Sequence, residues 1–224
     1  MRHYRALGIG VLAAAMCLCV RGQNAPGSGA QIETKGLPPR ATPADYQAQA
    51  QAGTLTIAAE FKGHSIPTLQ GALTTEEYVA IETGLFGAPG ARAKLAAGDF
   101  SLRINGKKAL LPAQPYGLVI GSVKDPEWEP PVPAAPKSKT GLSTGGKHEQ
   151  ADPNEPPPEP VRIPVPVLRA MAQRVQKASL PEGDRPLPQA GLIFFAYRGK
   201  TESIRSIELI YAGPAGQATL PLQP

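Results

Sequence analysis

The chain has few residues of the kinds that carry redox and metal chemistry. Its 224 residues include two cysteines and three histidines. Both cysteines fall in an N-terminal segment that we expect to be removed, which excludes disulfides, thiolate nucleophiles and cysteine-ligated metals for the mature chain. His64 and His148 stand about 84 positions apart, outside any cluster typical of a metal site. We expect both to be solvated loop residues, and we expect no metal or other cofactor.

Catalytic signatures are missing too. The sequence contains no G-x-S-x-G nucleophile elbow, no phosphate-binding loop and no dinucleotide fingerprint. Glu76 and Glu77 are adjacent acids of the type used in glycoside chemistry, but neighbours on a strand point to opposite faces, which favours a solvated pair. Aromatic residues make up only 5% of the chain, which is low for a protein that stacks sugars or bases. We therefore expect a protein that is not an enzyme.

The N-terminus has the pattern of an export signal. A short basic start is followed by an uncharged apolar run over residues 6–20, which is shorter than the roughly 20 residues that span a bilayer. Small or apolar residues precede a cleavage point after Gly22, so we expect a signal peptide over 1–22 and a secreted or periplasmic protein. Two alternatives remain open: an N-terminal helix of the folded domain, and a lipid anchor through Cys17 or Cys19.

Removal of the signal changes the charge. The whole chain has a formal net charge of +5, and the signal holds three arginines and no acid, so the mature chain is close to neutral. This weakens the case for nucleic-acid binding. We expect no nucleic-acid partner and no transmembrane span in the mature chain. The expected partner is another envelope protein or a cell-wall component.

Residues 23–41 are polar and turn-rich, which predicts a flexible lead-in. Thr42 and Pro43 then resemble a helix start, and Gly53 resembles a helix end, so we predict a short helix over 42–53. From Thr54 the hydrophobic period changes to two, which predicts strands. The predicted strands cover 54–62, 77–86, 92–97, 99–104, 107–111, 116–123, 190–197, 201–211 and 217–222. Residues 63–75 are predicted to form a loop, and Asn105-Gly106 a hairpin turn.

The middle of the chain looks different. Residues 126–166 hold 12 of the 26 prolines, and the acidic stretch over 126–160 is predicted to be a disordered insertion. Residues 167–180 follow as an amphipathic helix with an apolar stripe of Leu168, Met171, Ala172 and Val175. The strand over 190–197 is apolar on both faces, so we predict that this helix covers one of them.

About eight short strands with frequent turns and few helices predict a mainly β, antiparallel sandwich over 42–224. The segments Gly84-Leu-Phe-Gly87, Gly98-Asp-Phe-Ser-Leu-Arg-Ile104 and Gly191-Leu-Ile-Phe-Phe195 resemble the immunoglobulin-like domains of uncharacterised exported bacterial proteins. The resemblance covers 54–123 and 190–222 and lacks the Cys–Trp–Cys core of true immunoglobulin domains. It implies a role in binding or envelope assembly.

Four residues are candidate binding residues. Trp128, the only tryptophan, lies in an extended proline segment of the type that docks into a partner's groove; alternatively it packs on the sheet edge, which we favour. Arg169, Arg174 and Lys177 give the predicted helix a basic face that could meet an anionic lipid or wall surface. The favoured alternative is that the helix packs its stripe on the domain and solvates these charges.

Two functions follow. The first is an exported, non-enzymatic binding or structural module of the cell envelope. The second is an enzyme or enzyme inhibitor that acts through loops at one end of the sandwich. A deep polar pocket with convergent titratable groups would favour the second function, and a surface poor in pockets the first.

Overall fold

The computed structural model describes residues 35–129 and 163–224. Strands dominate the described residues, joined by two α-helices and four 3-10 turns. The strands are β1 (Ala48–Ala52), β2 (Leu55–Gly63), β3 (Ser65–Thr68), β4 (Gly71–Thr75), β5 (Tyr78–Phe86), β6 (Arg92–Leu95), β7 (Phe100–Ile104), β8 (Leu111–Gln114), β9 (Val123–Lys124), β10 (Gly183–Pro186), β11 (Gln189–Ala196), β12 (Ile207–Gly213) and β13 (Gly216–Leu222). The helices are α1 (Tyr116–Val119) and α2 (Val165–Ala178).

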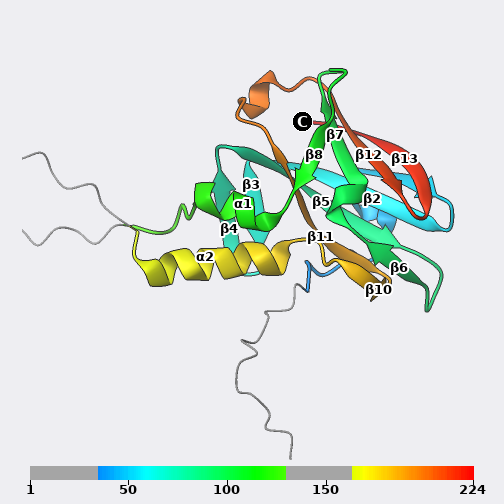
Figure 1. Ribbon diagram of the computed structural model, residues 1–224, viewed down its shortest axis with the longest axis horizontal. Helices are drawn as coiled ribbons and strands as arrows, with labels where there is room; N and C mark the ends of the chain where they lie inside the picture. The colour runs from blue at the N-terminus through cyan, green and yellow to red at the C-terminus, as the bar shows by residue number, and fades with distance from the viewer. Residues whose placement is uncertain (1–34, 130–162) are drawn as a thin grey trace, which may run out of the picture. The chain divides into compact units, whose positions relative to one another are not determined.

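Eight strands form one antiparallel sheet in the order β1-β2-β5-β11-β8-β7-β12-β13 (Figure 1). Its edge strands β1 and β13 approach each other, and the Gln47 side chain donates a hydrogen bond to the Gln223 carbonyl at 2.9 Å. The sheet is therefore nearly closed as a barrel. The predicted mainly β, antiparallel class is confirmed. The immunoglobulin-like sandwich is not confirmed, because β8 pairs with both β11 and β7 and so joins the strands into one continuous sheet.

The interior of this sheet is filled by alternate side chains. Ile57, Ile81, Leu102 and Leu209 come from four different strands, and none of them is exposed. Period-two alternation places such residues on one face of each strand, where they pack against one another. The strands predicted over 54–62, 77–86, 99–104 and 217–222 match β2, β5, β7 and β13 within a few residues.

Strand β11 is buried on both faces, as predicted. Ile193 and Phe195 pack in the interior of the sheet. Leu192 and Phe194 point to the other side, where they pack with α2. The strand approaches the segment that follows this helix so closely that a Cβ atom at Gly191 would lie 2.4 Å from the Leu180 Cα. The prediction that the amphipathic helix covers this face is confirmed.

The helix uses a slightly different stripe from the predicted one. Met171 and Val175 are buried, as expected, and Ala178 joins them. Leu168 is 40% exposed and lies outside the contact with the sheet. The buried stripe consists of Met171, Val175 and Ala178, at steps of four and three residues. It therefore begins and ends about one turn later than the predicted stripe.

The loop predicted over 63–75 is wrong. Strands β3 and β4 form a hairpin there, and β9 joins them as a third strand. Ile66 and Leu73 are fully buried beside Val123 under α2. Only one apolar residue of each strand faces the core, which leaves too short a pattern for recognition.

The helix predicted over 42–53 is also wrong. The helix start at Thr42 is real, but it opens only the 3-10 turn η1 (Pro43–Asp45). Residues 48–52 form β1 and pair with β2. The sequence Ala-Gln-Ala-Gln-Ala alternates with a period of two, so alanines face the core and glutamines face solvent. Pairing with β2 overrides the helix propensity of alanine.

The strand predicted over 116–123 is helical for most of its length. It contains α1, the 3-10 turn η3 (Ile120–Ser122) and only the first residue of β9. Pro115 precedes α1 with φ −64° and ψ 141°, and Val119 is the residue that turns into the core. The apolar run is a short helix with a single buried residue, which periodicity alone does not distinguish from a strand.

The Asn105-Gly106 turn is confirmed, with φ of 53° and 63°, but its return strand is not. The chain leaves the ladder after the turn, and β8 begins only at Leu111 instead of Lys107.

The strand predicted over 201–211 begins with the 3-10 turn η4 (Thr201–Ser203) and becomes β12 at Ile207. The strand predicted over 92–97 is β6, whose partner β10 was not predicted.

The described end of the predicted lead-in is fixed to the sheet. Leu37 forms a β-bridge with Ala190, and Arg40 makes ion pairs with two glutamates. The flexible lead-in is thus wrong for residues 35–41. The predicted signal over 1–22, the rest of the lead-in, and the insertion over 126–160 beyond Glu129 lie outside the described residues. Across 35–129 and 163–224, no helix is long and apolar enough to cross a membrane.

Candidate functional site

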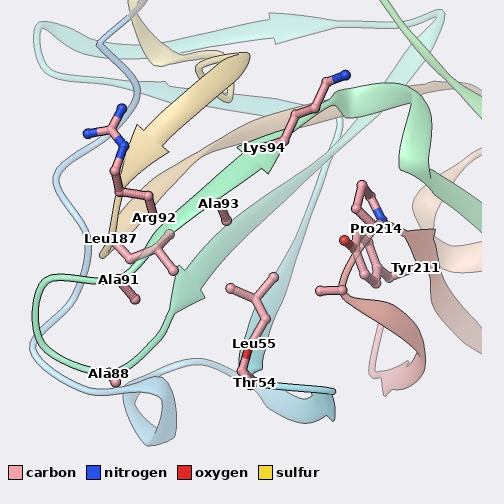
Figure 2. Close-up of a pocket in the computed structure, with 11 residues that line it drawn as sticks. Thr54, Leu55, Ala88, Ala91, Arg92, Ala93, Lys94, Leu187, Tyr211 and Pro214 are labelled. Carbon is pink, nitrogen blue, oxygen red and sulfur yellow. The ribbon is translucent and has the colours of Figure 1, made fainter.

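One end of the eight-stranded sheet carries a pocket of about 280 Å³. Its walls are the β1–β2 turn, the β5–β6 turn with β6, and the β12–β13 turn (Figure 2). Most of the lining is aliphatic, and the polar groups are a threonine, a tyrosine and the two basic residues of β6. The lining residues are Thr54, Leu55, Ala88, Ala91, Arg92, Ala93, Lys94, Leu187, Tyr211, Pro214 and Ala215.

Two hairpin turns meet at one wall of the pocket because a glycine allows them to. Gly53 has φ 59°, a left-handed conformation that glycine adopts without strain. A Cβ atom at this position would lie 2.4 Å from the carbonyl oxygen of Ala215. The absence of a side chain at Gly53 therefore brings the β1–β2 turn against the β12–β13 turn.

Tyr211 forms the floor on the β12 side. Its ring is buried and packs on Phe100 with ring centroids 5.1 Å apart. Burial raises the pKa of Tyr211, while a hydrogen bond with the Ala215 backbone acts in the opposite direction. The hydroxyl group is thus neutral at physiological pH and offers a hydrogen bond rather than a charge.

Strand β6 forms the opposite wall and points its side chains to alternate sides. Ala93 packs against the interior cluster, while the Arg92 and Lys94 side chains extend away from it (Figure 2). Arg92 Nε donates to Asp184 of β10 at 2.9 Å. Burial raises the pKa of the nearby Asp99, and the positive charge of Lys94 opposes that rise. Arg92 and Lys94 thus line the pocket while their side chains extend away from the interior cluster, Arg92 toward Asp184.

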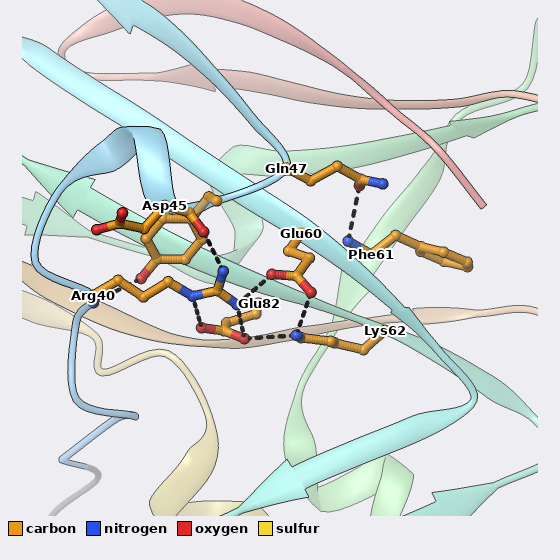
Figure 3. A network of polar contacts seen from close by, with 8 residues as sticks. Arg40, Asp45, Gln47, Glu60, Phe61, Lys62 and Glu82 are labelled. Carbon is orange, nitrogen blue, oxygen red and sulfur yellow. Dashed lines mark hydrogen bonds and ion pairs between the residues drawn. The ribbon is translucent and has the colours of Figure 1, made fainter.

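A network of four charges lies on the outer face of β2 and β5 (Figure 3). Glu60 and Glu82 face each other across the two strands, a repulsive pairing by itself. Arg40 and Lys62 each bridge both carboxylates. Arg40 also stacks on the ring of Tyr46, with its Cζ 4.5 Å from the centroid. The network thus fixes the segment around Arg40, which precedes β1, to strands β2 and β5.

The network sets the ionisation of its members. Burial by itself raises the pKa of Glu60, but hydrogen bonds from Lys62 and Arg40 outweigh it and hold that pKa below its usual range. All four charges are compensated by one another, so the cluster is a structural clamp rather than a set of groups open to a ligand.

The four predicted binding residues lie away from the pocket. Arg174 is only 13% exposed and donates to Asp125 at 2.6 Å, so it ties α2 to the chain after β9. Arg169 and Lys177 are exposed on α2. Trp128 is partly exposed, and its backbone N–H donates to the Asp125 carbonyl at 3.2 Å. The structure brings none of them to the lining of the pocket.

His64 is not the solvated residue that we predicted. Its Nδ1 lies 2.7 Å from the carbonyl oxygen of Tyr78, and its Nε2 lies 2.8 Å from that of Gly199. Its ring stacks on Tyr197, with centroids 6.3 Å apart. His64 therefore links the β2–β3 turn to β5 and to the loop after β11.

The predicted acid pair consists of separate ion pairs. Glu76 binds Lys124 at 2.7 Å, and Glu77 binds Arg198 at 3.0 Å. Within the part of the chain that the structure describes, no three His, Cys, Asp or Glu side chains are grouped as metal ligands.

Sequence reasoning missed the pocket because its residues come from five separate segments and most are alanine, leucine or proline. The useful signals were Gly53 and the turns at 87–90 and 213–216, which mark three chain reversals without showing that they meet. No protein-family model, curated protein or solved structure matches this chain.

Proposed function

We propose that the protein is an exported, non-enzymatic binding module of the cell envelope, and that the pocket between β6 and the β1–β2 and β12–β13 turns is its binding site. The pocket itself is the observation that carries the proposal. A concave, mostly apolar lining with a few polar groups is the usual character of a ligand site. At about 280 Å³, the pocket suits one side chain or a small molecule, and it is slightly smaller than the roughly 300–1,000 Å³ typical of ligand sites.

The chemistry of the lining favours binding over catalysis. Tyr211, Arg92 and Lys94 are its titratable residues, and the two basic side chains diverge instead of converging on one point (Figure 2). General acid–base chemistry needs paired groups within hydrogen-bond reach of one reacting atom.

Export rests on the basic, apolar N-terminal pattern of residues 1–22. N-terminal sequencing of the protein recovered from outside the cytoplasm should give a start near Gln23. An intact Met1 on a cytoplasmic product would contradict export.

Binding is tested by capture. The immobilised protein is exposed to an envelope extract, and retained compounds are identified by mass spectrometry. The variant Ala91→Phe fills the pocket from the β5–β6 turn, so it should lose the retained compound. Ala212→Phe adds the same ring at an exposed position of β12 outside the lining, and it should keep it. Equal capture by both variants would overturn the pocket as the site, and chemical conversion of the compound would replace binding by an enzymatic function.

A further inference from the structure

Strand β6 has one unpaired edge among the described residues, because it pairs only with β10. The Leu187 N–H donates to the Ala91 carbonyl at 2.9 Å, which makes Ala91 and Leu187 a hydrogen-bonded pair. In an antiparallel ladder such pairs alternate with pairs whose backbone groups point outward. The register then places the N–H and C=O groups of Arg92 and Lys94 on the edge away from β10.

A proline supports the same assignment of outward-pointing backbone groups independently. Pro186 stands opposite Arg92 in the ladder and has no N–H to donate. A proline is compatible with a pair whose backbone groups point outward, whereas a hydrogen-bonded pair would lose one of its two bonds. Both observations thus leave the same two residues of β6 with outward backbone groups.

The outward edge of β6 faces the pocket. Arg92, Ala93 and Lys94 all line the pocket, although the side chains of Arg92 and Lys94 extend away from that of Ala93 (Figure 2). Because side chains on both faces of the strand border the same cavity, the strand edge between them is the part that the three residues share toward it. We propose that the pocket takes an extended peptide segment of a partner protein, which adds as a strand to β6. This inference rests on the proposed function, because it names the ligand of the same site.

The surroundings specify the peptide. Main-chain bonds to Arg92 and Lys94 supply affinity in strand addition, and side-chain pockets supply specificity. One apolar side chain of moderate size would enter between Leu55, Leu187 and Tyr211. The ammonium group of Lys94 makes no ion pair among the described residues, whereas Arg92 is paired with Asp184. An acidic residue of the peptide would therefore lie beside Lys94.

The backbone contact is tested with a matched pair of variants. Arg92→Pro removes the outward N–H, and Arg92→Ala keeps it, while both lose the ion pair to Asp184. Because the Arg92 N–H is not used in the β6–β10 ladder, the proline variant removes no ladder bond. The probe is a mixed library of N-acetylated pentapeptide amides. The wild type and Arg92→Ala should enrich peptides with an apolar centre and an acidic flank, and Arg92→Pro should not.

A second measurement covers the case in which Arg92→Pro does not fold. An enriched peptide is resynthesised with one backbone N-methyl group at a time. Methylation of the N–H that meets β6 should weaken binding about tenfold, the effect expected for one lost backbone hydrogen bond. The amide protons of Arg92 and Lys94 should exchange rapidly in the free protein and slowly in the complex.

The outcomes separate this inference from the proposed function. If Ala91→Phe abolishes capture but no peptide is enriched, or if N-methylation changes nothing, the ligand is not an added strand and the binding module stands. Capture of a small amphipathic anion with unchanged exchange of the Arg92 and Lys94 amides would likewise exclude an added strand while leaving the binding module in place. Equal enrichment by the wild type and a folded Arg92→Pro variant would also overturn the inference.

Discussion

Thr83 lies on the same side of β5 as Ile81 and Leu85, inside the eight-stranded sheet, and it has no exposed surface. Its Oγ1 finds no hydrogen-bond partner among the described residues. A buried hydroxyl without a partner loses its bonds to water on folding and gains nothing in return, at a cost of about 1–3 kcal/mol.

Valine has nearly the same shape as threonine without the hydroxyl. We therefore expect Thr83→Val to raise the free energy of unfolding by about 1 kcal/mol, measured by urea denaturation. Thr75→Val is the matched control, because the buried Thr75 Oγ1 lies 2.7 Å from the Ser122 Oγ. The control should lose about 1 kcal/mol. A loss at both positions would mean that the Thr83 hydroxyl has a partner.

Glu60 gives the fold a dependence on pH. Its pKa is lower in the folded chain than its usual value of 4.5, so the stabilisation from its charge is complete above the usual pKa and is lost as the pH falls through the lowered one. Urea midpoints measured from pH 6 to pH 3 should fall in the wild type. Glu60→Gln should start less stable and fall less steeply. Glu202→Gln, at an exposed glutamate, should leave the wild-type curve unchanged.

At the scale of elements, the contact between β11 and α2 determines how the outer face of the sheet is covered. Phe194 packs with Met171 and Val175 outside the sheet, and Phe195 packs inside it. Both phenylalanines are at most 1% exposed. Burial of this completeness on both faces makes β11 the strand on which the two hydrophobic clusters depend.

Phe194→Ala and Phe195→Ala should each lower the free energy of unfolding by about 3–5 kcal/mol. Met171→Asp should be nearly as damaging, since it places an unpaired charge against Phe194. Leu168→Ala, on the exposed side of α2, should cost less than about 1 kcal/mol. Chemical denaturation measures all four. A nearly neutral Phe194→Ala would show that α2 does not cover this face in solution.

The elements that were predictable from sequence are those whose pattern comes from their own burial. Strand β11 is apolar at every position from Leu192 to Phe195, and α2 has a helical stripe, so the pattern of each indicates its state. Residues 48–52 lack such a pattern, because alanine and glutamine suit a helix and only pairing with β2 makes them a strand. The short helix α1 fails for a related reason: four residues are too few to show a period.

The pocket could not be predicted because it is a property of contacts between elements. Leu55, Leu187 and Tyr211 are far apart in the sequence, and each is explained locally as an ordinary apolar residue. Only the register of β6 with β10 turns the backbone groups of Arg92 and Lys94 toward the unpaired edge of a strand that lines the cavity. A single sequence contains the strand pattern of β6 but not the identity of its partner.

At the scale of the whole sheet, near-closure and the pocket depend on the same junction. Strands β1 and β13 are the two edges, and their turns meet where Gly53 lies against Ala215. Any atom added at Gly53 must push the β12–β13 turn away. Because Pro214 and Ala215 line the pocket, such a shift changes the pocket as well as the contact between β1 and β13 that nearly closes the sheet.

Gly53→Ala should therefore act on stability and binding together. The φ of 59° at this position disfavours any residue with a Cβ atom by about 1–2 kcal/mol, and contact with the Ala215 oxygen adds to this cost. Gly98→Ala is the control, since its added Cβ would meet no atom within 4 Å and its φ is not in the left-handed region. We expect Gly53→Ala to lower the urea midpoint and to weaken capture of the retained compound, and Gly98→Ala to change neither. Loss of stability with unchanged capture would mean that the β12–β13 turn does not shape the site, and the binding surface would then be restricted to β6 and the β5–β6 turn.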